Sequence, residues 1–165
     1  MKKKLGLFLV LLLGVSVLTT GCGKSANEKA AEKSLEASMG ANADVNIEGD
    51  NVNIKTDDGT WSAGENISLP EGWPEDVYVT EGNILAAASN SLGNSLTIVS
   101  EKSVAELKKE YQEKVSENGW EINMSFDTEG NVLYGAEKDD RSLSVTISTD
   151  DEGQTTVMII ESQIQ

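Results

Sequence analysis

Hydrophobic and polar residues alternate in short runs along the chain after residue 43, and a period of two predicts β-strands. Val45 and Ile47 form the first run, and Val52 and Ile54 form the second. The sequences EGDN and TDDG follow them and contain the Gly-Asp and Asp-Gly pairs that favour tight hairpin turns. The pattern therefore predicts a small unit of linked β-hairpins over residues 44–67.

A second set of alternating runs occupies residues 83–165. It begins with NILAAAS and NSLTIVSEK, on either side of the turn sequence NSLG. Four further strands are predicted at WEINMSF, VLYGAEK, SLSVTIS and TTVMIIES. The intervening sequences DTEGN, DDR and DDEG are rich in turn residues, which is the pattern of an antiparallel meander.

A helix is predicted between these two groups of strands, in VAELKKEYQEKVSEN. Ser103 and Glu106 have the spacing of a capping box at its start, and Gly119 can end it. Its apolar residues recur at helical spacing on one face: Val104, Leu107, Tyr111 and Val115. The predicted fold class is α+β, with an antiparallel meander sheet packed by one helix on one face.

Two of the predicted strands also indicate which side chains face the helix. The first carries apolar residues at every second position, namely Trp120, Ile122, Met124 and Phe126. The other does so at Leu143, Val145 and Ile147. We expect both sets in the core, with Trp120 close to the point where the helix crosses the sheet.

Residues 68–82 are predicted to link the hairpin unit to the α+β domain. This segment contains Pro70 and Pro74, the only two prolines of the chain. Proline favours an extended backbone in the residue before it, and the ring of Trp73 could hold such a segment on a core.

The N-terminus has the pattern of a secretory signal peptide over residues 1–21. Three lysines precede an uncharged run from Leu5 to Leu18, which is shorter than the roughly 20 residues that a membrane-spanning helix needs. Small residues then follow, as at a cleavage site.

The residues that end this segment resemble the lipobox of bacterial lipoproteins. Thr20, Gly21 and Cys22 match its last three positions. The resemblance implies cleavage between Gly21 and Cys22 and a diacylglyceryl group on Cys22, with palmitate-type chains holding the protein on the extracytoplasmic face of the cell membrane. Cys22 is also the only cysteine, and lipidation explains it better than a lone free thiol in an oxidising compartment.

Residues 22–43 are rich in alanine, glutamate and lysine and separate the anchor from the first hairpin. Ser25 and Glu28 have capping-box spacing, so part of the segment is predicted to be helical. Ala31, Leu35 and Met39 form a thin apolar stripe, which leaves two alternatives. The helix docks on the domain through this stripe, or the segment is a flexible tether.

Composition excludes several classes of function. The chain has no histidine and a net charge of −15. These features exclude histidine-based catalysis and histidine metal ligands and disfavour nucleic acid as a partner. Aligned on their glycines, the acidic turns do not match an EF-hand, and no phosphate-binding loop is present. We predict no catalytic residues, no metal and no cofactor.

Residues 68–162 also resemble domains of small, uncharacterised secreted bacterial lipoproteins, in LPEGWPEDV, the SxxELxxxY helix start and ENGW. The resemblance implies fold and location only.

Trp61 and Trp73 are candidate ligand-binding residues, although each is also suited to packing. The predicted function is a non-enzymatic binding or interaction module with an envelope protein or glycan as partner. The alternative is a small carboxylate-dependent hydrolase acting on cell-envelope glycan.

Overall fold

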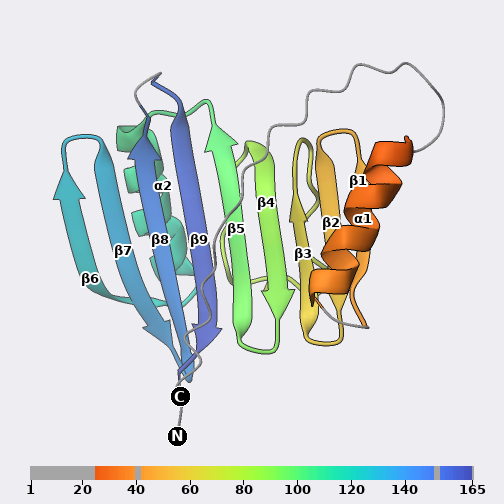
Figure 1. Ribbon diagram of the computed structural model, residues 1–165. Coiled ribbons are helices and arrows are strands. Elements are labelled where there is room, and N and C mark those ends of the chain that lie inside the picture. Colours follow the sequence, from red (N-terminus) through yellow and green to blue (C-terminus); the bar gives the residue numbers. More distant parts are fainter. Residues whose placement is uncertain (1–24, 40–41, 151–152, 165) are drawn as a thin grey trace, which may run out of the picture.

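The computed structural model describes residues 25–39, 42–150 and 153–164, and these ranges contain two helices and nine strands (Figure 1). The signal peptide and Cys22 lie outside the described residues. The helices are α1 (Ala26–Met39) and α2 (Val104–Glu117). The strands are β1 (Asp44–Glu48), β2 (Asn51–Thr56), β3 (Gly59–Ala63), β4 (Asn83–Asn90), β5 (Gly93–Ser100), β6 (Glu121–Thr128), β7 (Asn131–Lys138), β8 (Arg141–Thr149) and β9 (Thr155–Gln163).

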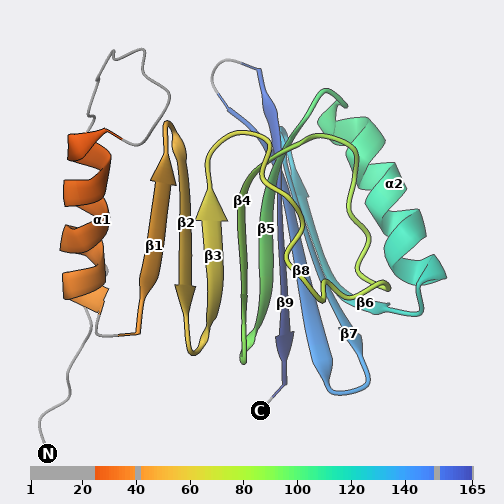
Figure 2. The ribbon, with the colours of Figure 1, turned by 90° about the vertical axis from the view of Figure 1, so that its right-hand side faces the viewer.

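All nine strands form one antiparallel sheet, in the order β1-β2-β3-β4-β5-β9-β8-β7-β6. After β5, α2 carries the chain to the far edge, and the meander β6–β9 returns until β9 pairs with β5. The two helices lie on opposite sides of the sheet, α1 in front of its β1 end and α2 behind its other half (Figures 1 and 2). The α+β class and the meander with one helix on one face are therefore confirmed.

The hydrophobic core lies between α2 and the sheet. Leu107, Tyr111 and Val115 of α2 are buried, as the helical spacing predicted. The capping box also forms, since the Ser103 side chain accepts from the Glu106 N–H while the Glu106 carboxylate accepts from the Ser103 N–H. This start signal and the apolar face together fix where the helix begins and which side packs.

The expectation that Met124 and Phe126 belong to this core is wrong. Ile122 pairs with Ala136 and packs against the core, but the next paired residue is Met124, opposite Gly135. The β-bulge between them adds one residue to β6, so every later side chain changes face. Met124 and Phe126 are consequently 50% and 59% exposed on the opposite side of the sheet.

Residues 68–82 lie in the connection between β3 and β4 and also pack against the core. Val77 is buried, and Trp73 is partly buried with its Nε1–H donated to the Val77 carbonyl at 3.1 Å. Trp120 is 3% exposed, as expected for a core residue, and donates its indole N–H to the Asp76 carbonyl at 2.8 Å. The carboxylate of Asp76 also binds the side chains of Lys138 and Arg141. The segment is therefore fixed across the face that α2 occupies.

The predicted hairpins form, and they extend the same sheet. The Gly49–Asp50 and Asp57–Asp58 turns join β1 to β2 and β2 to β3, and β3 pairs with β4 along its whole length. Helix α1 is docked beside β1, so the docked alternative describes the structure. Its apolar stripe does not make the contact, because Leu35 and Met39 are exposed and none of its residues is buried.

Candidate functional site

The interior of the fold leaves no room for a ligand between α2 and the sheet. Ile98, Ile147, Val157 and Ile159 lie at the centre of this layer with an exposed fraction of 0%. Leu107 and Tyr111 of α2 are equally buried against them. Side chains fill this space, so a binding site on the described part of the chain has to lie on an outer surface.

A broad outer surface that neither described helix covers is the side of the sheet that faces away from α2, over the strands β3, β4, β5, β9, β8, β7 and β6. We call this surface the open face. It is turned toward the viewer in Figure 1, where α2 lies behind the sheet. Strand pairing aligns its side chains in two rows that cross seven strands. From β6 to β3, the first row is Phe126, Leu133, Thr146, Met158, Thr97, Ala86 and Ala63. The second row is Met124, Gly135, Ser144, Ile160, Ser95, Ala88 and Trp61.

The open face exposes large apolar side chains at three places along these rows. Trp61 lies on β3 and is 42% exposed. Met158 and Ile160 lie on β9 with exposed fractions of 45% and 43%, and Met124 and Phe126 lie on β6. Between them stand hydroxyl-bearing and small residues. Contiguous exposed apolar surface of this kind is typical of an interaction site.

Neither row contains a charged residue, although the chain carries a net charge of −15. Acidic side chains elsewhere on the protein repel anions and other acidic surfaces. A neutral apolar region is therefore the part of the described surface that an uncharged or acidic partner can approach with the least repulsion.

The structure places the two predicted ligand-binding tryptophans differently. Trp61 belongs to the open face, beside Ala88 and Ile54. Trp73 packs against the core on the opposite side, so its ring has a structural role. Sequence reasoning did not pick out Met158 and Ile160. A signal was present in TTVMIIES, where apolar residues occupy both faces of the strand and not only the buried one.

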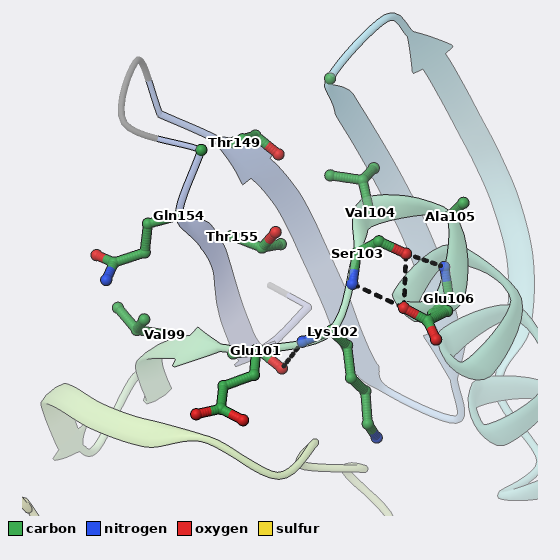
Figure 3. Close-up of a pocket in the computed structure, with 13 residues that line it drawn as sticks. Val99, Glu101, Lys102, Ser103, Val104, Ala105, Glu106, Thr149, Gln154 and Thr155 are labelled. Atoms are coloured by element: carbon green, nitrogen blue, oxygen red, sulfur yellow. Dashed lines mark hydrogen bonds between the residues drawn. The ribbon is translucent and has the colours of Figure 1, made fainter.

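A second candidate is a hollow of about 860 Å³ near the start of α2 (Figure 3). It is bounded by the end of β5, the first turn of α2 and the turn residues of β8 and β9. Among its described lining residues, Glu101 and Glu106 carry carboxylate groups. Glu106 is held by the capping box, with its carboxylate 2.7 Å from Ser103 Oγ, and is not free to act as an acid on a substrate.

Three of the described carboxyl groups have pKa values that their neighbours lower. Hydrogen bonds from Arg141 and then Lys138 lower the pKa of Asp76 to about 2. The bonds from Ser103 lower the pKa of Glu106. Burial opposes ionisation of Glu110, yet hydrogen bonds from Lys102, Tyr78 and Thr80 outweigh it and lower its pKa. A glycosidase general acid needs a raised pKa.

Comparisons with known proteins give one match. A family model described as START domain-like matches residues 79–155. The match runs from the end of residues 68–82, which cover the core beside α2 and are called the covering segment, through α2 to the start of β9. No curated protein and no solved structure matches the chain.

Within the described ranges, no group of acidic residues is arranged to hold a metal ion. Neither described helix is long and apolar enough to cross a membrane.

Proposed function

We propose that the protein is a non-enzymatic binding module, anchored through a lipidated Cys22 to the extracytoplasmic face of the cell membrane. The lipobox-like Thr20-Gly21-Cys22 after an apolar run supports the anchor. The similarity of residues 79–155 to START domain-like proteins supports a ligand-binding role over catalysis. The observation that carries the proposal is the pair of uncharged rows on the open face, with their exposed apolar residues.

The binding surface in this proposal is the open face and not an internal cavity. The space beneath α2 is filled, which leaves outer surfaces for recognition. Partners then engage a broad outer area, and Trp61 supplies an aromatic ring at one end of it.

Photo-crosslinking in cells tests the binding surface. A photoreactive amino acid replaces Met158 or Trp61 on the open face, and Glu113 on the exposed side of α2 serves as the control position. We expect adducts from the two open-face positions and none from the control. Equal adducts from all three positions, or none from any, would refute the open face as the binding surface.

Cell fractionation tests the anchor independently. Two acyl chains bind a membrane far more firmly than one, so the parent protein should sediment with membranes. Cys22→Ser should release the protein into the soluble extracytoplasmic fraction. A variant that has lost its signal peptide and still sediments with membranes would show that Cys22 is not the attachment point.

A further inference from the structure

We propose that the partner of the open face is a second copy of this chain, packed sheet against sheet about a two-fold axis that runs parallel to β9. This rests on the proposed function, which makes the open face a binding surface and Cys22 the membrane anchor. It adds the identity of the occupant and the geometry with which it binds.

The strand order makes β9 the midpoint of the open face. Starting from β9, the strands β8, β7 and β6 follow on one side, and β5, β4 and β3 follow on the other. A two-fold axis along β9 places each strand over the strand at the same distance on the other side of the partner's β9. β6 therefore covers β3, β7 covers β4, and β8 covers β5, while β9 covers itself.

The residues of the two rows complement one another under this operation. Away from the axis, large side chains come to lie over small or flexible ones, and hydroxyl groups over hydroxyl groups. The resulting pairs are Phe126 with Ala63, Leu133 with Ala86, Gly135 with Ala88, Met124 with Trp61, Thr146 with Thr97, and Ser144 with Ser95. Met158 and Ile160 each meet their own counterpart on the axis.

The position of α1 agrees with this arrangement. β1 and β2 are the two strands that extend the sheet beyond β3, and α1 lies on the open-face side of that extension (Figure 1). In the dimer this extension reaches past the partner's edge strand β6. Helix α1 therefore flanks the second copy and leaves the seven strands of the open face uncovered.

Size agrees with a second copy, and charge restricts where such a copy can bind. Two chains of net charge −15 repel each other at most orientations, and contact through uncharged rows keeps acidic groups away from the centre. Seven strands spaced about 4.8 Å apart, with four open-face residues along β8, cover roughly 600 Å² per copy. Stable protein interfaces bury about 800 Å² per partner, so the two values are of the same order.

The two membrane anchors are also compatible with this symmetry. α1 runs antiparallel to β1, because Glu28 binds the backbone of Gly49 while Glu36 binds that of Val45. An axis parallel to the strands leaves the Ser25 end of both α1 helices at the same end of the dimer. Both lipidated Cys22 residues can then enter one membrane.

Sedimentation of the mature chain carrying Cys22→Ser tests whether the dimer exists. We expect this protein to form dimers as its concentration is raised toward about 1 mM. Met158→Glu should remain monomeric over the same range, because the Met158 side chain lies on the axis. Leu69→Glu is the matched control, since Leu69 is also 45% exposed but lies off the open face. It should remain dimeric. A monomeric parent protein across this range would overturn the proposal.

Cysteine crosslinking in the same background tests the geometry. Ile160→Cys should form a covalent dimer with a bismaleimide crosslinker that spans about 10 Å, since it meets itself on the axis and facing sheets lie about 10 Å apart. Trp61→Cys alone should not, but a mixture of Trp61→Cys and Met124→Cys should. Any departure of the two sheets from parallel displaces outer strands more than central ones, so Ile160→Cys is the decisive variant. A dimer without this crosslink would refute the proposed axis.

The two experiments also separate this proposal from the proposed function. A monomeric protein whose open-face photo-crosslinks carry a different envelope component would retain the binding module and exclude the second copy as its partner. Adducts with the mass of two chains, found only from the open face, would support both.

Discussion

The carboxylate of Glu32 in α1 accepts a hydrogen bond of 2.8 Å from the backbone N–H of Ile47 in the edge strand β1. Glu28 and Glu36 make the same contact with Gly49 and Val45, at 3.3 Å each. Four residues of helix rise about 6 Å, and two residues of strand advance about 6.8 Å, so the two spacings match. The helix thereby satisfies alternate N–H groups of an edge that would otherwise be free to pair with other strands.

Replacing Glu32 with alanine should expose the β1 edge locally. A hydrogen bond of this kind contributes about 0.5–1.5 kcal/mol, so the Ile47 amide should exchange its hydrogen roughly 3- to 10-fold faster than in the parent. Residue-resolved hydrogen exchange measures this. Lys33→Ala is the control, because Lys33 is exposed and adjacent in α1. Unchanged exchange at Ile47 would mean that the carboxylate does not protect this amide.

The ion pairs of Asp76 predict a loss of stability in acid. Its folded-state pKa of about 2 lies below its ordinary value of 3.8, so ionised Asp76 stabilises the fold above about pH 4. That contribution is lost as the pH falls from about 4 to about 2. Asp76→Asn should therefore lower the free energy of unfolding by about 1–2 kcal/mol at neutral pH and by little near pH 2.

Urea unfolding at both pH values measures this difference. Glu75→Gln is the matched control, since Glu75 is exposed and next in sequence. If Asp76→Asn lost the same stability at both pH values, its effect would come from packing and not from the ion pairs with Lys138 and Arg141.

Local signals predicted most of the fold. The capping box at Ser103, the helical spacing of Leu107, Tyr111 and Val115, and the paired turn residues act within a few positions of each other. Such short-range physics can be deduced from sequence alone. The α+β class followed from these elements.

The remaining features depend on long-range pairing. The bulge after Ile122 reverses the faces of Met124 and Phe126, and its sequence contains no glycine or proline that would indicate it. The role of Glu28, Glu32 and Glu36 depends on a strand that follows α1, and their spacing on one helix face also suits solvent exposure. Most of the open face was likewise missed, because its rows form only when seven strands align.

The packing of residues 68–82 predicts how the chain can be shortened. A fragment of residues 83–165 lacks Trp73, Asp76 and Val77, which cover the core beside α2. We expect it to give a poorly dispersed amide spectrum, whereas residues 64–165 should give a dispersed one with β4 as the new edge. A well-dispersed spectrum for residues 83–165 would show that the covering segment is dispensable.

The contrast between Trp120 and Trp61 gives the last prediction. The Trp120 ring is 3% exposed, lies 4.8 Å from the Arg141 guanidinium carbon and donates its N–H to the Asp76 carbonyl. Alanine there leaves a cavity and removes one of the two hydrogen bonds that this carbonyl accepts, the other coming from Asn118. Trp120→Ala should lower the free energy of unfolding by about 3–5 kcal/mol, a large part of the roughly 5–15 kcal/mol of such a domain. Trp61→Ala removes a ring that is 42% exposed and should change it by less than about 1 kcal/mol while weakening open-face contacts. Thermal and urea unfolding at low protein concentration compare the two variants. Equal losses would mean that Trp61 is a packing residue and that the open face has a smaller binding area than its rows suggest.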